Sequence, residues 1–223
     1  MVPEDVPDSN RCPVCRTLRI RHFMTVEGKA YWRCRVCEAT FVAQAHWPDR
    51  EVERAEYDKH ENAADDPAYR EFLSRLSEPL LARLQRRLTG LDFGCGPAPV
   101  LVQMLEEAGH TMRCYDPIYA PDETALTGTY DFITCTEVIG HLRNPRAVFE
   151  AFDTLLRPGG WLGVMTEFQT VDSRFESWHY RRDPTHIIFY RATTLTLLGS
   201  RLGWTLEIPR RNVALFRKPN KSR

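Results

Sequence analysis

Short apolar runs and amphipathic stretches alternate from about residue 90 to the C-terminus, and this alternation limits the possible folds more than any other feature. The apolar runs have the length of strands, whereas the stretches between them show the apolar spacing of helices. The predicted strands are 89–93, 110–116, 130–135, 161–168, 204–208 and 213–218. The predicted helices are 98–109, 144–160 and 191–203. This order predicts an α/β fold with a mostly parallel sheet and helices on both faces.

Three shorter segments precede the predicted α/β domain. The predicted order is a disordered N-terminus, a four-cysteine segment, a helical linker or lid, and the α/β domain: residues 1–10, 11–47, 48–89 and 90–223. In the linker, an apolar stripe with helical spacing begins at Tyr69. Pro79 and the sequence "ADDP" interrupt the helical pattern, so the linker is predicted to contain two helices with a break or new start at Pro79.

The charge balance narrows the classes of partner. The chain has 30 basic and 30 acidic residues and a formal net charge of zero, so no overall basic excess calls for nucleic acid or an anionic membrane. It has no apolar run of 18 residues that could span a bilayer. The acidic N-terminus does not have the composition of a signal or transit peptide. We therefore expect a cytoplasmic protein with reduced thiols.

Four of the seven cysteines form two Cys-x-x-Cys pairs. Cys12 and Cys15 are followed, after 18 residues, by Cys34 and Cys37, which is the spacing of a Cys₄ zinc ribbon. Four thiolates leave no open coordination position, so the predicted zinc is structural. A segment this short cannot build its own core, and metal binding would supply its folding free energy. The alternatives are four free thiols and, less favoured, a redox dithiol.

The same segment is basic and aromatic. Its Arg and Lys residues are Arg11, Arg16, Arg19, Arg21, Lys29, Arg33 and Arg35. Basic residues near Tyr31, Trp32 and Phe41 could bind RNA, although four thiolates around zinc offset two of the charges. The preferred interpretation is a ribbon that packs on the α/β domain.

The stretch "LDFGCGPAP" follows the first predicted strand, at the sheet edge where α/β proteins bind ligands. Gly94 and Gly96 let the backbone approach a ligand, but the third glycine of a dinucleotide fingerprint is absent. Asp92 would repel a pyrophosphate and attract an ammonium group. Asp116 ends the next predicted strand, where a carboxylate can accept both ribose hydroxyls. A nucleoside that carries an amino acid and no phosphate fits these features, and S-adenosylmethionine is such a molecule.

Four stretches carry a family resemblance. "LDFGCGPAP", "CYDP", "YDFITCTEVIGHL" and "LLRPGGWLGVMT" resemble, in order and spacing, the core motifs of class I S-adenosylmethionine-dependent methyltransferases. The resemblance implies a Rossmann-like, seven-stranded sheet whose last strand is antiparallel. It also implies the following cofactor-binding residues: Asp92, Phe93, Gly94, Cys95, Gly96, Asp116, Pro117, Thr136 and Glu137. Thr136 and Glu137 would edge the reacting centre.

The sequence departs from the family pattern in two places. The interval between Asp116 and Tyr130 is short, so the third strand is expected to be reduced. The family's adenine-contacting acid is not identifiable there, and Ala125 and Leu126 are its substitutes. Many members of one branch of the family, which resemble the ubiquinone-type O-methyltransferases, read Glu-x-x-Glu-His after the fourth strand, where this chain has Gly140 in place of the second acid. That departure argues against a catalytic divalent metal at this point.

Methyl transfer needs an aligned acceptor and a base of near-neutral pKa, which histidine supplies. The candidate catalytic residues are His141, His179, His186, Glu137 and Tyr57. His141 and His179 are the preferred bases, and Asp183 in "DPTH" could brace the loop through His186. The chain also resembles a bacterial branch with an N-terminal zinc ribbon, and this implies that Tyr57, His60 and Asn62 belong to a lid.

Three functions remain open at this stage. The preferred prediction is a methyltransferase that uses S-adenosylmethionine and structural zinc and acts on a small-molecule acceptor. One alternative is an RNA base methyltransferase whose ribbon binds RNA, and the other is a non-catalytic cofactor-binding or interaction protein. A closed, aromatic-lined pocket favours the first, and a basic groove from the ribbon to the cofactor favours the second.

Overall fold

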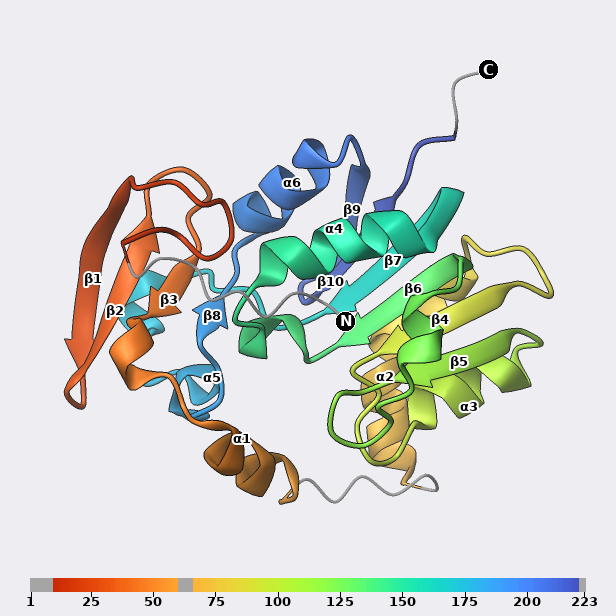
Figure 1. The fold of residues 1–223 in the computed structure, drawn as a ribbon, viewed down its shortest axis with the longest axis horizontal. Coiled ribbons are helices and arrows are strands. Elements are labelled where there is room, and N and C mark those ends of the chain that lie inside the picture. Colours follow the sequence, from red (N-terminus) through yellow and green to blue (C-terminus); the bar gives the residue numbers. More distant parts are fainter. Residues whose placement is uncertain (1–9, 60–65, 221–223) are drawn as a thin grey trace.

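The part of the chain that the structure describes forms one large and one small sheet, joined side by side (Figure 1). The structure is a computed structural model, and it describes residues 10–59 and 66–220. The predicted disordered N-terminus therefore lies, apart from Asn10, outside the described residues. No helix of the described ranges is long and apolar enough to cross a membrane.

The large sheet has the strand order β5-β4-β6-β7-β10-β9. Its strands are β4 Thr89–Phe93, β5 Thr111–Tyr115, β6 Tyr130–Thr136, β7 Leu156–Met165, β9 Thr205–Arg210 and β10 Val213–Arg217. The first four are parallel to one another, and β10 is antiparallel to both β7 and β9. The mostly parallel α/β sheet with an antiparallel last strand is confirmed.

Six strands in this part of the chain correct the family-implied number of seven. The missing strand is the third one, because residues between β5 and β6 form only the short 3₁₀ helix η2 Glu123–Leu126 and an isolated bridge of Asp116 with Ala120. Too few residues connect β5 to β6 for a crossover helix and another strand. The expected reduction of the third strand is thus complete.

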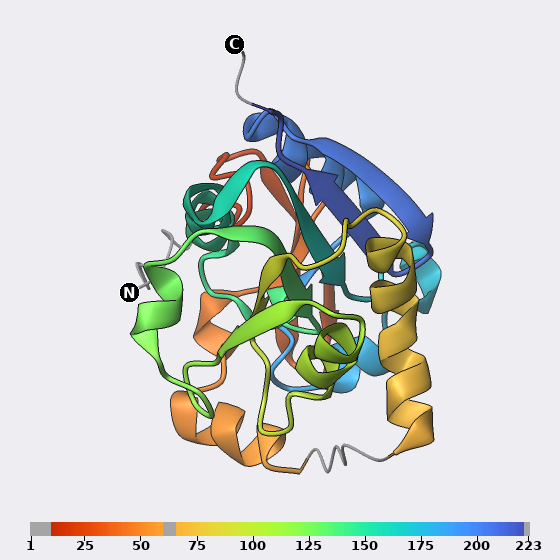
Figure 2. The same cartoon turned by 90° about the vertical axis from the view of Figure 1, so that its right-hand side faces the viewer.

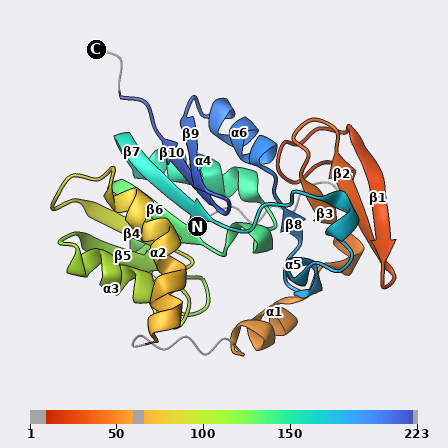
Figure 3. The ribbon, with the colours of Figure 1, turned by 180° about the vertical axis from the view of Figure 1, so that it is seen from behind.

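Helices cover both faces of the large sheet (Figure 2). On one face lie α2 Pro67–Leu81 and α3 Val100–Glu107, whose leucines pack with Phe132 and Leu215 (Figure 3). On the other face lie α4 Pro145–Leu155 and α6 Ala192–Arg201, which pack with Ile133, Leu162 and Phe216. Each helix presents one apolar stripe to the sheet, and the sheet is therefore buried on both sides.

Three details differ from the predictions. Pro79 lies inside α2 and does not break it, because it falls in the last turn of the helix, where few further hydrogen bonds depend on it. The two predicted linker helices exist, but α1 Arg50–Tyr57 and α2 are divided at Asp66, which caps α2 ahead of Pro67 at its first position. Strand β7 begins at Leu156, which is five residues earlier than predicted.

The small sheet joins the four-cysteine segment to the α/β domain. Strands β1 Ile20–Val26, β2 Lys29–Cys34 and β3 Thr40–Val42 are antiparallel neighbours, and β8 Ile188–Phe189 adds to β3. We call residues 11–47 the cysteine ribbon. Between β7 and β8 the chain forms the short helices η4 Asp172–Arg174 and α5 His179–Arg182. Because β8 directly follows these helices and pairs with β3, the ribbon is attached to the part of the chain that follows β7.

Candidate functional site

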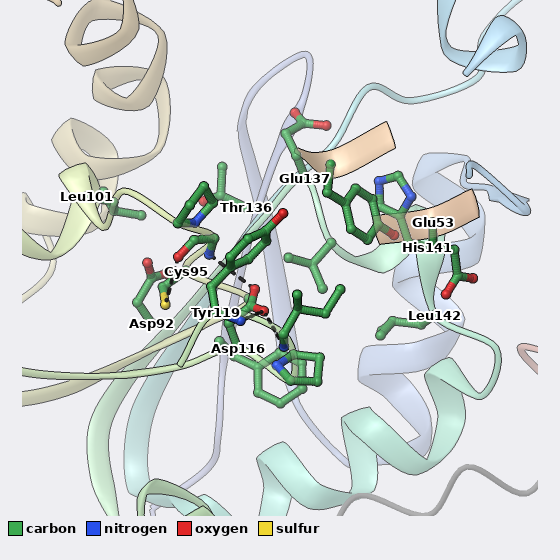
Figure 4. A pocket seen from close by; sticks show the side chains of 18 of the residues that line it. Glu53, Asp92, Cys95, Leu101, Asp116, Tyr119, Thr136, Glu137, His141 and Leu142 are labelled. Atoms are coloured by element: carbon green, nitrogen blue, oxygen red, sulfur yellow. Dashed lines mark hydrogen bonds between the residues drawn. The ribbon is translucent and has the colours of Figure 1, made fainter. Parts of the chain in front are cut away.

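A cavity of about 1030 Å³ opens at the carboxyl ends of the parallel strands. Residues that follow β4, β5 and β6 line it, together with residues of α1, α2 and the segment 179–186. Figure 4 shows Asp92, Cys95 and Asp116 on one side and Glu137, His141 and Glu53 on the other. We call these sides the cofactor end and the acceptor end. The cavity has room for two ligands of ordinary metabolite size.

The glycine loop forms the wall of the cofactor end. Gly94 and Gly96 have φ angles of +79° and +64°, a backbone region that favours glycine. A Cβ atom at Gly94 would lie 2.2 Å from the side chain of Val138, whereas one at Gly96 would meet nothing within 4 Å. Gly94 therefore allows close packing of the loop on the turn after β6, and Gly96 faces open space.

Asp116 holds the cofactor end together. Its Oδ1 accepts hydrogen bonds from the amides of Ile118 and Tyr119 at 2.8 and 3.0 Å, and its Oδ2 accepts one from the amide of Gly96 at 3.1 Å. The carboxylate thus links the glycine loop to the turn after β5. Asp92 lies beneath the loop, accepts a hydrogen bond from Thr134 at 2.6 Å, and has a pKa that burial raises to about 6.

Glu137 stands where β6 meets the acceptor end. Its φ angle is +56°, which is strained for a residue with a side chain. Tyr180 donates a hydrogen bond to Oε2, while Oε1 is buried without a hydrogen-bond partner among the described residues. Burial raises the pKa of Glu137 to about 7, although Tyr180 and Arg75 act in the opposite direction. A carboxylate in this position is ready to accept a proton or a hydrogen bond from a ligand.

His141 and His186 pack against each other beside Tyr180. The ring centroids of the two histidines are 4.1 Å apart, and those of His186 and Tyr180 are 4.6 Å apart. Asp183 accepts a hydrogen bond from His186 Nδ1 at 2.8 Å, which confirms the predicted contact between these residues. The carbonyl of Thr185 accepts one from His141 Nδ1 at 3.0 Å. The side chains of Glu137, Tyr180, His186 and His141 thus form a continuous row along the cavity.

The other predicted catalytic residues lie at the edges of this row. Tyr57 packs edge-on against His141, and burial raises its pKa well above the usual range, so its hydroxyl stays protonated. His179 lines the cavity with an exposed ring whose Nε2 is 4.0 Å from a carboxylate oxygen of Glu167. His60 and Asn62 lie outside the described residues.

The cofactor-binding residues predicted from the sequence come together in space. All nine line the cavity: Asp92, Phe93, Gly94, Cys95, Gly96, Asp116, Pro117, Thr136 and Glu137. Of the predicted adenine contacts, Ala125 is fully buried, with its carbonyl bonded to Tyr130, and neither it nor Leu126 is part of the described cavity wall. Ile118 and Tyr119 line the wall there instead, because the chain turns back directly after Asp116.

Comparisons with known proteins agree with this geometry. The methyltransferase domain family matches residues 60–207, which is more than half of the chain. The chain belongs to the methyltransferase domain family. The class I, S-adenosylmethionine-dependent methyltransferase that the motifs predict is therefore confirmed as its family and fold.

Curated relatives match only part of the chain. The ubiquinone biosynthesis O-methyltransferase of Colwellia psychrerythraea is 37% identical over 100 residues, and that of Paraburkholderia xenovorans is 36% identical over 99 residues. Each match covers 44% of this chain and 39% or 42% of the relative. The chain therefore spans about two fifths of the length of these relatives.

Two solved structures share the fold. The 1,6-didemethyltoxoflavin-N1-methyltransferase of Burkholderia thailandensis, solved with S-adenosylhomocysteine, has a TM-score of 0.53 at 15% identity, covering 90% of this chain and 100% of that one. An O-methyltransferase family protein from the same organism has a TM-score of 0.51 at 15% identity, covering 77% and 67%. At these identities the likeness concerns the methyltransferase fold alone.

The four ribbon cysteines of this methyltransferase-family chain converge. They are buried, with Sγ–Sγ distances of 3.6 Å between Cys12 and Cys37 and 3.4 Å between Cys15 and Cys34. Four sulfurs around one zinc ion at about 2.3 Å would be about 3.8 Å apart. Backbone amides point at the sulfurs of Cys12 and Cys34, which favours thiolates. The donor set therefore fits a closed tetrahedral zinc site.

The ribbon uses some of its basic residues for packing. Arg33, which is 5% exposed, donates to Asp172 at 2.8 Å, and Arg191 contacts the same carboxylate. Arg16 donates to the side chain of Asn144 at 2.7 Å. These contacts bind the ribbon to the methyltransferase domain, as the preferred interpretation of the sequence predicts.

The sequence reasoning missed residues that α2 contributes to the cavity. Tyr69, Phe72 and Arg75 line it, although the sequence pattern places Tyr69 only in the apolar stripe of a helix. Arg75 packs on Phe72 and influences the pKa of Glu137. The available signal was Arg75, a cation at helical spacing from Tyr69 and Phe72. It could be used only once the tertiary structure had placed the helix over the sheet edge.

Proposed function

We propose that this chain transfers a methyl group from S-adenosylmethionine to a small-molecule acceptor. The observation that carries the proposal is the cavity itself. It joins the glycine loop and Asp116 at one end to Glu137, Tyr180 and the two histidines at the other. Its walls are rich in aromatic side chains, which suits a small organic acceptor more than a polynucleotide. The likeness to the curated O-methyltransferases supports the same class of acceptor.

The cofactor end would bind S-adenosylmethionine through the loop at Gly94–Gly96 and through Asp116. Both oxygens of Asp116 already accept backbone hydrogen bonds, which orient them. Oδ1 accepts two and Oδ2 accepts one, so Oδ2 has a further lone pair for a ribose hydroxyl. Asp92 would face the ammonium group. S-adenosylmethionine supplies a methyl group that is already activated on a sulfonium, so the protein mainly aligns the acceptor and removes its proton.

Glu137 is the proposed base of the acceptor end. Tyr180 fixes one carboxylate oxygen by a hydrogen bond, and Oε1, which has no hydrogen-bond partner among the described residues, would accept the proton. A pKa raised to about 7 is suited to proton transfer at neutral pH. This assignment adds to the histidines preferred on sequence grounds, whose roles as bases stay predictions.

The cysteine ribbon is proposed to hold one structural zinc ion through Cys12, Cys15, Cys34 and Cys37. Metal binding would supply the folding free energy that its small core cannot. The ion would have no open position and would take no part in the reaction.

The proposal is tested by incubating the protein with S-adenosylmethionine labelled on the methyl group, in one sample with a bacterial metabolite extract and in another with total RNA. We expect label in the small-molecule fraction and its loss with Asp116→Ala. Label in RNA alone would support the alternative function and contradict the proposed acceptor class. No label in either sample, from a protein that binds S-adenosylhomocysteine in calorimetry, would contradict catalysis.

A further inference from the structure

The row of side chains at the acceptor end contains two imidazoles whose orientations are fixed. His141 Nδ1 faces a carbonyl oxygen, which can only accept, so Nδ1 carries the proton and Nε2 carries the lone pair in the neutral ring. His186 Nδ1 faces the carboxylate of Asp183, and the same reasoning gives its Nε2 the lone pair. Metal-binding histidines donate Nδ1–H to a carbonyl or a carboxylate in the same way and bind the ion through Nε2.

His186 Nε2 lacks a hydrogen-bond partner in the described ranges although the residue is only 8% exposed. A buried nitrogen with a lone pair is costly unless a ligand satisfies it. Ligand atoms of His141, Asp183 and His186 all lie within 4.8 Å of one another, and both histidines line the cavity. We propose that His141 and His186 bind a divalent transition-metal ion of the zinc, cobalt or nickel type through their Nε2 atoms.

Asp183 belongs to this site as a positioning residue. Its Oδ1 accepts hydrogen bonds from the amide and hydroxyl of Thr185 at 2.8 and 2.6 Å, and its Oδ2 accepts the one from His186. With these contacts in place, it orients the His186 ring without binding the ion itself. The ion then has two imidazole ligands from the protein and keeps open positions for water and the acceptor.

Gly140 explains why this site differs from the Glu-x-x-Glu-His pattern. A Cβ atom at position 140 would lie 2.5 Å from His186 Cδ2 and 3.1 Å from His186 Nε2. A glutamate there and the observed His186 ring exclude each other. On sequence grounds, the glycine at position 140 argues against a metal. In the structure, the same glycine leaves the space that lets the His186 imidazole reach His141.

The use of the ion rests on the proposed function, whereas its binding does not. An acceptor oxygen or nitrogen bound to the open positions would be more acidic and would be held beside Glu137. Imidazole nitrogens favour zinc, cobalt or nickel over magnesium. Because the protein supplies only two ligands, we expect a modest affinity for the ion. An acceptor with two adjacent donor atoms would complete the coordination shell and strengthen binding.

The test adds Co²⁺ to protein whose cysteine ribbon is already loaded with zinc. We expect one further equivalent of cobalt, with weak visible bands and without the intense near-ultraviolet absorption of a thiolate ligand. His186→Gln, which keeps a polar side chain of similar length, should abolish this binding, and His141→Gln should abolish it as well. Asp183→Asn should weaken it by about 10–100-fold. The matched control is His22→Gln, on an exposed position of β1.

Two results would overturn the proposal. One is wild-type protein that binds no cobalt beyond the ribbon site, and the other is unchanged cobalt affinity in His186→Gln. Binding of S-adenosylhomocysteine, measured by calorimetry on every variant, reports folding of the cavity separately. If wild-type protein binds cobalt at His186 but not S-adenosylhomocysteine, the proposed function fails and the metal site stands.

Discussion

The two ends of the cavity are built in different ways. The cofactor end comes from two short stretches, residues 92–96 and 116–119. Backbone groups of the adjacent strands β4 and β5 hold these stretches together, and Gly94 N donates a hydrogen bond to Tyr115 O at 2.7 Å. The acceptor end draws on α1, the turn after β6 and the segment 179–186. It is held at Ile187, whose amide donates to Gly140 O and whose carbonyl accepts from Val42 N of the ribbon, both at 2.9 Å.

This difference indicates that the two ends depend on different parts of the molecule. The cofactor end relies on the large sheet, which the methyltransferase fold provides in many proteins. The acceptor end relies on the cysteine ribbon, because β3 pairs with β8 immediately after His186. Changes to the ribbon should therefore disturb the acceptor end first, and changes to Asp116 should disturb the cofactor end alone.

The largest effect is expected from Cys34→Ala. Loss of one thiolate breaks the proposed zinc site, and the ribbon should unfold with loss of the ion. Metal analysis and amide hydrogen exchange followed by mass spectrometry measure this. Residues 179–190 should exchange much faster, while 89–96 change little. The control is Cys114→Ala, a half-buried cysteine of β5. If residues 179–190 exchange at the same rate in Cys34→Ala as in the wild type, the ribbon does not support the acceptor end.

Glu137→Gln should reduce turnover by about 10²–10⁴-fold, the usual cost of losing one general base, while the affinity for S-adenosylhomocysteine is retained. The measurement combines the labelled methyl-transfer assay with calorimetry, and Glu106→Gln on the exposed face of α3 is the control. Near-normal turnover would move the base to another residue of the acceptor end, with His141 and His179 as the sequence-predicted choices.

Asp116→Ala should weaken binding of S-adenosylhomocysteine by about 10–150-fold, which corresponds to about 1.5–3 kcal/mol for hydrogen bonds to a charged group. Calorimetry measures the affinity, and Asp122→Ala, an exposed acid in the cap of η2, is the control. The cobalt affinity of the acceptor end should not change. An unaltered Kd would remove Asp116 from the cofactor site.

The smallest effect concerns pH, because each end holds one carboxyl whose pKa is raised by burial. Burial raises the pKa of Asp92 to about 6 and that of Glu137 to about 7, so both bind a proton more tightly in the folded state. Their protonated forms therefore stabilise the fold at low pH, and this contribution is lost as pH rises through the folded-state pKa. As the pH rises from 5 to 6, each carboxyl should lower the free energy of unfolding by about 1 kcal/mol.

Denaturant unfolding across this range tests the pH effect. Asp92→Asn and Glu137→Gln should each flatten the profile, and by similar amounts. If only one variant flattens the profile, only one of the two carboxyl groups is buried in solution. A profile that neither variant changes would show that neither carboxyl has a raised pKa.

The sequence predicts the parts of the molecule that depend on neighbouring residues. Strand and helix order follows from apolar periodicity, and the Cys₄ arrangement follows from two tight turns, in which Arg16 and Glu38 adopt positive φ angles after each pair. The positions of Gly94, Gly96 and Asp116 were also readable, because the first two strands of an α/β unit lie side by side. Even the contact of Asp183 with His186 is local, three residues apart.

Only the tertiary structure decided the acceptor end. Strand β8 has two residues and no periodicity of its own, so its pairing with β3, far away in the sequence, depends on docking of the ribbon. The same docking places His186 over Gly140 and against His141, and it gives the loss of an acid at position 140 a structural reason. Sequence by itself determined the fold family and the cofactor loop, since local hydrogen bonds and turn geometry specify them. The chemistry beside the acceptor depended on packing between segments more than 40 residues apart.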